Sequence, residues 1–227
     1  MDNLALFDID GTLIMGSRGH HLAFSKAFKQ VYGIDTDVDI ISHHGMTDQE
    51  MIFNILKKNG LNEEKIREKL QECKKMLIDN FNKTINSDSI VILDGVQELL
   101  KGLDKNRILI GLVTGNLEPI AKAKLKRAGL NSYFKVGAFG SDDMNRINLV
   151  RLAIKRAMEL GFNNKRNNKK VFLFGDTPKD ILAGKEEGVK TIGIATGIYS
   201  KKQLQNAGAD FVFANLKDTA RILEIIL

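Results

Sequence analysis

Near its start the chain reads LALFDIDGT at residues 4–12, four apolar residues followed at once by a polar turn with two aspartates. Unbroken apolar runs are typical of strands covered on both faces, as in a parallel sheet between helices. Similar runs occur in ILIGLVTGN (108–116) and VFLFGDTPKD (171–180), and again at residues 191–195 and 211–213. Amphipathic helical patterns separate them, at 119–128, 149–160, 181–187 and 218–226. The sequence therefore predicts an α/β fold with a doubly wound parallel sheet.

Residues 16–89 interrupt this alternation of strands and helices. They contain no convincing strand but show helical patterns near 20–31, 47–58 and 63–81. Glycines punctuate these helices, and residues 86–89 have the composition of a linker that returns to the core. We predict an inserted α-helical cap at 16–89 and an α/β core at 1–15 and 90–227. The alternative is one larger domain with a long first crossover.

The composition is that of an ordinary soluble protein. The 227 residues are 43% hydrophobic and 27% charged, which excludes a disordered or collagen-like chain. The single cysteine, Cys73, cannot form an internal disulfide and is expected as a free thiol. The N-terminal residues lack the positive charge of a signal peptide, and no run of 18 apolar residues occurs. We expect a cytoplasmic protein with no membrane partner.

The net charge raises the question of nucleic-acid binding. Lysine and arginine number 34 against 28 acidic residues, a balance of 34 − 28 = +6. The densest basic cluster has no interleaved aromatic residues for stacking on bases, and a solvated loop explains it; it comprises Lys165, Arg166, Lys169 and Lys170. We expect no specific nucleic-acid partner, although the excess charge would concentrate small anions.

Polar residues follow three of the predicted strands, where ligands bind in open α/β sheets. These tips carry Asp8 and Asp10, then Thr114, then Asp176 and Asp180. One such tip is explained by helix capping alone, but three together indicate a site. Four carboxylates in one crevice require a counter-ion. Oxygen donors with no adjacent histidine or cysteine suit Mg²⁺.

The spacing Asp8-x-Asp10 has a chemical meaning of its own. Two carboxylates at one strand end can divide the work of a nucleophile and a proton carrier if their environments separate their pKa values. Gly11 permits a sharp turn, and Thr12 offers a hydroxyl and an amide to an oxyanion.

Together, the three motifs resemble those of the haloacid dehalogenase superfamily, in the same order along nearly the whole chain. Residues 16–89 are similar in position and size to the cap of its phosphoglycolate phosphatase and β-phosphoglucomutase branch. The resemblance implies that Asp8 attacks phosphorus to form an aspartyl-phosphate and that Asp10 acts as acid and base. Thr114 and the backbone amides around Gly115 and Asn116 would hold phosphoryl oxygens.

The resemblance also implies a Mg²⁺ site and exposes one departure. The ion would be bound by the Asp8 side chain, the Asp10 carbonyl and Asp176, with Asp180 adjusting the shell. The family normally places a lysine before its last motif. The best counterpart here is Arg146, which keeps the charge; the alternative is a solvated arginine at a helix start.

Substrate choice is expected to lie in the cap. His20 and His21 begin its first helix, and His43 and His44 precede Thr47 in a turn that resembles the specificity segment of such caps. We take His20 and Thr47 as candidate substrate residues. Surface histidine is the commoner outcome, and Arg18 is an equally good partner for a carboxylate-bearing substrate.

These observations predict a Mg²⁺-dependent phosphatase that hydrolyses a small soluble phosphomonoester, with phosphoglycolate-like substrates favoured by the cap. A β-phosphoglucomutase-like phosphotransferase is one alternative, because it needs the same acids. A binding protein without turnover is another, because Arg146 replaces the usual lysine. The protein is expected to be a monomer or a homodimer.

Overall fold

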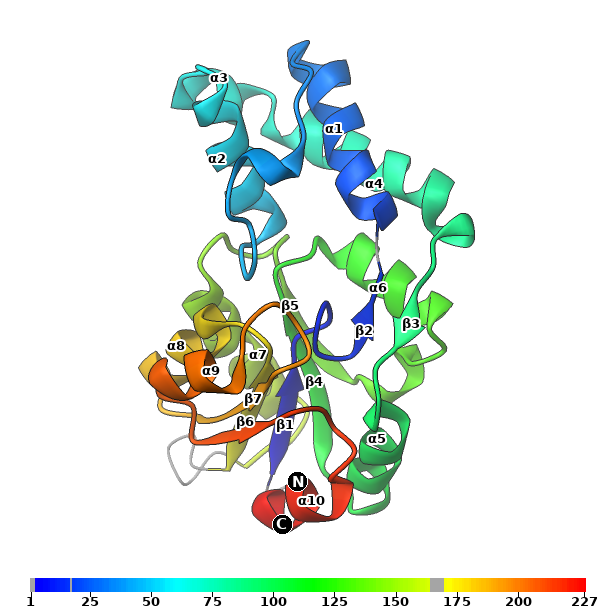
Figure 1. The fold of residues 1–227 in the computed structure, drawn as a ribbon, viewed down its shortest axis with the longest axis vertical. Coiled ribbons are helices and arrows are strands. Elements are labelled where there is room, and N and C mark those ends of the chain that lie inside the picture. The colour runs from blue at the N-terminus through cyan, green and yellow to red at the C-terminus, as the bar shows by residue number, and fades with distance from the viewer. Residues whose placement is uncertain (1–2, 17, 164–169) are drawn as a thin grey trace.

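A computed structural model describes residues 3–16, 18–163 and 170–227. Its main sheet has six strands in the order β5-β4-β1-β6-β7-β8, and every neighbouring pair is parallel (Figure 1). The strands are β1 Leu4–Phe7, β4 Leu109–Thr114, β5 Val136–Phe139, β6 Val171–Gly175, β7 Lys190–Ile194 and β8 Phe211–Phe213. The predicted fold class is confirmed. The edge strand β5 was not predicted from the sequence.

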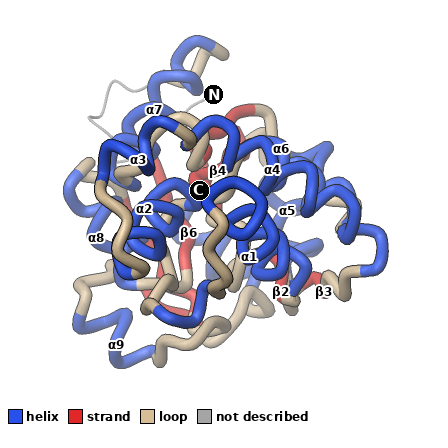
Figure 2. Tube along the Cα trace, turned by 90° about the horizontal axis from the view of Figure 1, so that it is seen from above, coloured by secondary structure: helices blue, strands red, loops and turns tan. Residues whose placement is uncertain are grey.

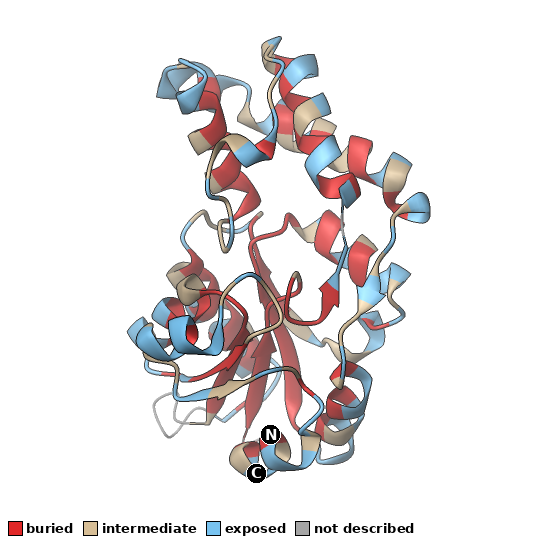
Figure 3. Cartoon of the chain, in the orientation of Figure 1, coloured by how far each residue is buried: buried red, intermediate tan, exposed pale blue. Residues whose placement is uncertain are grey.

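Helices cover both faces of the sheet. Alternate residues of β1 enter different cores, with Ala5 and Phe7 in one and Leu4 and Leu6 in the other, so the whole strand is apolar and buried (Figure 3). The first core includes residues of α5 Val96–Lys105, α6 Glu118–Arg127 and α10 Thr219–Ile226; the second, of α7 Arg146–Glu159 and α8 Pro178–Glu186. The remaining elements of this part are η3 Asn131–Tyr133 and α9 Lys201–Asn206.

A layer of helices lies over the carboxyl ends of the strands (Figures 1 and 2). It comprises α1 Arg18–Tyr32, η1 Val38–Ile40, α2 Asp48–Lys58, α3 Glu63–Glu68, α4 Leu70–Thr84 and η2 Ile85–Ser87. These helices share their own apolar core, which extends to Leu117 and Ile120 at the edge of the sheet domain. We therefore propose residues 16–89 as the cap. The helix predicted at 63–81 is two helices, which meet at Lys69.

A small antiparallel pair joins the cap to the core. It consists of β2 Ile14–Met15 and β3 Val91–Ile92. Neither strand was predicted from the sequence. Gly16, with φ +97°, lies directly beside the carbonyl of Ser89, where a Cβ would collide. The two chain crossings between core and cap therefore run side by side.

Three further predictions concern the Cys73 thiol, membrane-spanning helices and the basic cluster at residues 165–170. Cys73 is a free, buried cysteine, and burial raises the pKa of its thiol to about 12. Among the described residues, none of the helices combines the length and apolarity needed to cross a bilayer. In the basic cluster, Lys165, Arg166 and Lys169 lie outside the described residues.

Candidate active site

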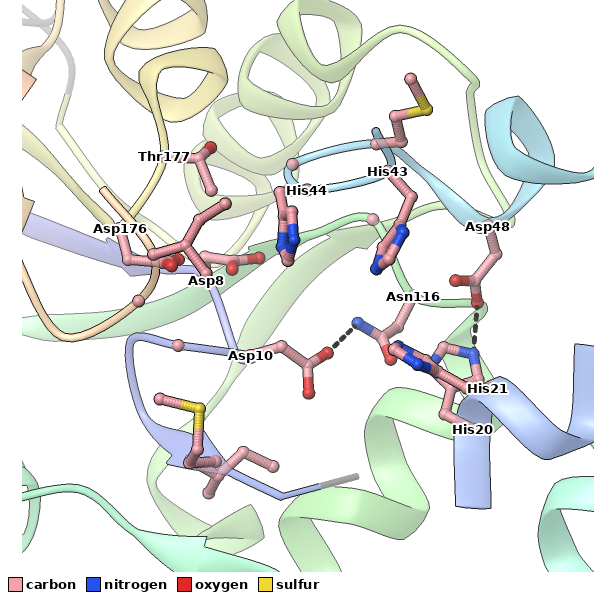
Figure 4. Close-up of a pocket in the computed structure, with 18 of the residues that line it drawn as sticks. Asp8, Asp10, His20, His21, His43, His44, Asp48, Asn116, Asp176 and Thr177 are labelled. Carbon is pink, nitrogen blue, oxygen red and sulfur yellow. Dashed lines mark hydrogen bonds and ion pairs between the residues drawn. The ribbon is translucent and has the colours of Figure 1, made fainter. Parts of the chain in front are cut away.

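A cavity of about 550 Å³ lies between the cap and the carboxyl ends of the central strands (Figure 4). The core lines it with Asp8, Asp10, Gly11, Gly115, Asn116, Arg146 and Asp176, and the cap with Arg18 and all four histidines of the chain. The polar strand ends therefore share one cavity, on the side of the sheet where open α/β folds bind ligands.

Three buried carboxylates meet at the core side of this cavity. Oxygens of Asp8, Asp176 and Asp180 all lie within 4.8 Å of one another, and each of the three residues is buried. Asp8 follows β1, whereas Asp176 and Asp180 follow β6 and begin α8. Segments more than 160 residues apart are brought together because β1 and β6 pair in parallel, with Phe7 opposite Phe174.

Asp180 serves the helix as well as the cluster. Thr177 is the N-cap of α8, and the backbone N–H and hydroxyl of Thr177 both donate to Asp180 Oδ2, at 3.1 and 2.7 Å. Pro178 takes the first helical turn, where its missing N–H costs nothing. Asp180 therefore both caps α8 and belongs to the acidic cluster.

Burial sets the protonation of the cluster. It raises the pKa of Asp8 to about 7, although Arg146 opposes the change, and it raises the pKa of Asp176 to about 8, with repulsion from Asp8 and Asp180 adding to the effect. A cation among these oxygens would remove the repulsion. The oxygen-only donor set fits a hard divalent ion such as Mg²⁺.

Arg146 is not a solvated arginine. It is the first residue of α7 and is 8% exposed. Its Nη1 donates to Asp8 Oδ1 at 3.3 Å and also pairs with Asp180. Burial would lower the pKa of Arg146, but Asp180 and Asp8 raise it above the usual value. Its buried Nε has no hydrogen-bond partner among the described residues, which leaves one donor for a ligand.

Asp10 points away from the acidic cluster. Its carboxylate accepts hydrogen bonds from Lys124 Nζ, at 2.7 and 2.9 Å, and from Asn116 Nδ2 at 2.7 Å. Withdrawal from bulk water would raise the pKa of Asp10, but Lys124 and His20 hold it below the usual value. Asp8 and Asp10 thus have pKa values shifted in opposite directions, the condition for two carboxylates to take different roles.

Lys124 is a site residue that was not predicted from the sequence. Its side chain is 1% exposed, and its Nζ also donates to Asn116 Oδ1 at 2.7 Å and lies 3.2 Å from His20 Nδ1. The sequence did contain a signal for a buried lysine. The helical spacing of the apolar residues Ile120, Ala121 and Leu125 puts position 124 on the buried face of α6. A lysine at such a position needs a partner inside the protein.

Asp48 is a second site residue that was not predicted from the sequence. His20 Nε2 lies 3.4 Å from Asp48 Oδ2. A dashed line marks this contact in Figure 4. Asp48 Oδ2 also accepts the N–H of Leu117 at 2.7 Å, and the Asp48 N–H donates to the Gly115 carbonyl at 2.8 Å. A Cβ on Gly115 would lie 2.9 Å from Thr47 Cα, so glycine lets the cap backbone approach the β4 loop.

Four of the predicted site residues, Asp180 and three threonines, do not line the cavity themselves. Thr114 and Thr12 are fully buried; the Thr114 hydroxyl accepts from Asn116 Nδ2 at 3.0 Å, and the Thr12 hydroxyl lies 3.5 Å from Asp176 Oδ1. Their hydroxyls therefore contact Asn116 and Asp176, which line the cavity. Thr47 is the N-cap of α2 and donates to the Met144 carbonyl at 3.1 Å. Arg18, in contrast, is exposed at the cavity rim.

We expect Thr47→Ala to lower the free energy of unfolding by about 1–2 kcal/mol, because the N-cap hydroxyl accepts the Glu50 N–H and is buried. Urea unfolding measures this loss, and Thr47→Ser, which keeps the hydroxyl, is the matched control. A tenfold rise in KM for a phosphate ester at unchanged stability would instead assign Thr47 to the substrate.

A family model described as haloacid dehalogenase-like hydrolase matches residues 5–194. The chain therefore belongs to this family of hydrolases, which confirms the family resemblance and the expectation of a hydrolytic enzyme. Over 94% of this chain and 88% of the relative, it is 28% identical to 2-deoxyglucose-6-phosphate phosphatase 2 of Saccharomyces cerevisiae.

Other relatives also carry names of phosphate-releasing enzymes. Pyrophosphatase PpaX of Halalkalibacterium halodurans is 26% identical, covering 98% of this chain and 97% of the relative. Phosphoglycolate phosphatase of Vibrio vulnificus is 24% identical, covering 99% and 96%. Among solved structures, a hydrolase from Pseudomonas syringae aligns over 99% of both chains with a TM-score of 0.74 at 21% identity, which supports the fold.

Proposed function

We propose that this protein is a Mg²⁺-dependent phosphatase that hydrolyses a small phosphomonoester, phosphoglycolate-like in size and charge, through an aspartyl-phosphate on Asp8. The observation that carries the proposal is the convergence of Asp8, Asp176 and Asp180 within 4.8 Å in a cavity beneath the cap. The names of the relatives, all enzymes that release phosphate, support it.

Asp8, Asp176 and Asp180, with the Asp10 main-chain carbonyl, would hold the ion. When bound, Mg²⁺ neutralises charge on the phosphoryl oxygens and on the surrounding acids. The Asp10 carboxylate is engaged by Lys124 and Asn116 and is therefore kept for proton transfer.

The hydrolysis takes two displacements at phosphorus. In the first, an Asp8 oxygen forms a bond to phosphorus while the ester P–O bond breaks, and the leaving oxygen takes a proton from Asp10. In the second, water attacks the aspartyl-phosphate, Asp10 accepts a proton from that water, and inorganic phosphate leaves with Asp8 restored. Arg146 Nε is a free buried donor for a phosphoryl oxygen.

Lys124 favours the ionised form of Asp10. The ionised Asp10 that Lys124 stabilises is the form that accepts a proton from water. For the first displacement Asp10 must carry a proton, and the proton that Asp10 accepts from water in the second displacement restores this form.

The substrate is proposed to be a small molecule because the cavity, at about 550 Å³, is in the usual size range of small-molecule sites. Arg18 at the rim and His20 inside are the proposed contacts for the leaving group. We further propose a cytoplasmic monomer or homodimer without a specific nucleic-acid or membrane partner.

A panel of phosphate esters with Mg²⁺ tests the proposal. It includes phosphoglycolate, 2-deoxyglucose 6-phosphate, pyrophosphate and a hexose 1-phosphate, with free phosphate and hexose 6-phosphate both measured. Release of phosphate from a small ester is the expected result. Conversion of the 1-phosphate to the 6-phosphate without release would identify a phosphotransferase, and no turnover of any ester would identify a binding protein.

We expect Mg²⁺ to bind more tightly at pH 8.5 than at pH 6. Without metal, burial gives Asp8 and Asp176 pKa values of about 7 and 8, so both are largely protonated at pH 6 and an ion must displace those protons. The same raised pKa values make the metal-free protein lose stability as pH rises toward 8. The Mg²⁺-induced rise in Tm should therefore be larger at pH 8.5, and an equal rise at both pH values contradicts the assignment.

A further inference from the structure

A second group of potential metal ligands lies in the cap at the edge of the cavity. Nitrogen atoms of His21 and His43 and a carboxylate oxygen of Asp39 all lie within 4.8 Å of one another. His21 is on α1, Asp39 is in η1, and His43 belongs to the loop that leads to α2. The rings of His21 and His43 are nearly perpendicular, with centroids 5.1 Å apart.

These donors differ in chemistry from the acidic cluster. Two imidazoles and one carboxylate favour first-row transition ions such as Zn²⁺ over Mg²⁺, which prefers oxygen alone. Nδ1 of His43 is buried and has no hydrogen-bond partner among the described residues. An unsatisfied buried nitrogen is costly unless a ligand occupies it.

The environment favours neutral imidazole, the form that binds a metal. Burial lowers the pKa of His21, and His20 and His43 lower it further, while Asp39 opposes them. The pKa of His44, which stacks on His43, is also lowered, by burial and then by His43. The Asp39 carboxylate within the same group would repel an anion, so the cluster suits a cation better.

We propose that His21, Asp39 and His43 form a binding site for a divalent transition ion of the Zn²⁺ type, separate from the catalytic acids. Three protein ligands leave at least one coordination position open. An ion there would tie α1 to the loop that precedes α2. Figure 4 shows His43 and His44 pointing from that loop toward the side of the cavity that holds Asp8 and Asp10, so the ion would sit at the cavity entrance. The site does not depend on the proposed phosphatase activity.

The test uses the full-length chain without a histidine tag, stripped of metal and held in excess Mg²⁺ so that the acidic cluster is occupied. Zn²⁺ binding is measured by calorimetry and Co²⁺ binding by visible absorption, which reports the ligand set directly. We expect one ion per chain, and the same stoichiometry in Asp176→Asn, which disables only the acidic cluster.

His21→Asn and His43→Asn are expected to weaken Zn²⁺ binding by more than about tenfold each, and Asp39→Asn to weaken it as well. His44→Asn is the matched control, because it changes a neighbouring exposed histidine outside the three-residue group. Melting curves show whether each variant is folded. The proposal is overturned if the wild-type chain binds no Zn²⁺ at 1 mM, if binding survives in both histidine variants, or if Asp176→Asn abolishes it.

Discussion

Asp8→Asn is expected to reduce phosphate release from p-nitrophenyl phosphate by at least about 10³-fold, because it removes the nucleophile of the covalent route. The Asp8 residue is 5% exposed, and its carboxylate lies among Asp176, Asp180 and Arg146. Burial already holds its pKa at about 7, so a neutral amide of similar shape fits the same space. The folded state should therefore survive, and the loss should appear in kcat.

Asp94→Asn is the control, because Asp94 is exposed and pairs with the exposed Lys217. Turnover is measured for both variants with Mg²⁺ and with EDTA, and the acid-stable phosphoenzyme is sought by mass spectrometry. Wild-type protein should carry one added phosphoryl group on the peptide that contains Asp8, and Asp8→Asn none. Turnover that persists in Asp8→Asn and in EDTA would refute the aspartyl-phosphate mechanism.

The central strands could be predicted because a strand covered on both faces has to be apolar throughout. Residues 4–7 show this directly, since they alternate between two cores and all are buried. β5 was not predicted, because its sequence VGAF contains two small residues and its partner β4 alone fixes its position. The break at Lys69 also left no sequence signal, because no glycine or proline marks it.

The acidic part of the site was predictable for a similar reason. Asp8 and Asp176 directly follow apolar runs, and parallel pairing brings such positions to one edge of the sheet. Contacts between cap and core were not predictable. Asp48 has the appearance of an acid in the first turn of a helix, and its hydrogen bond with the Leu117 N–H exists only once the cap is seated on the core.

Lys124→Met is expected to reduce kcat by about 10²-fold and, because ionised Asp10 accepts a proton from water in the second displacement, to move the acid limb of the pH profile of kcat to higher pH. Lys124 Nζ contacts both carboxylate oxygens of Asp10. Withdrawal from water would raise the pKa of Asp10, and Lys124 is the largest influence that lowers it. Without the ammonium, a smaller fraction of Asp10 is ionised at any given acidic pH, so proton transfer fails at a higher pH than in the wild type.

Lys126→Met is the matched control, because it removes an exposed charge from the same helix and leaves Asp10 untouched. Methionine at 124 keeps the apolar stem in the buried position, so a change in the pH profile at unchanged Tm would separate an effect on Asp10 from a loss of folding. A lysine that only fills the interface between cap and core would alter Tm and leave the acid limb in place. That second outcome would remove Lys124 from the catalytic machinery and leave Asn116, whose Nδ2 lies 2.7 Å from Asp10 Oδ2, as the group that orients the acid.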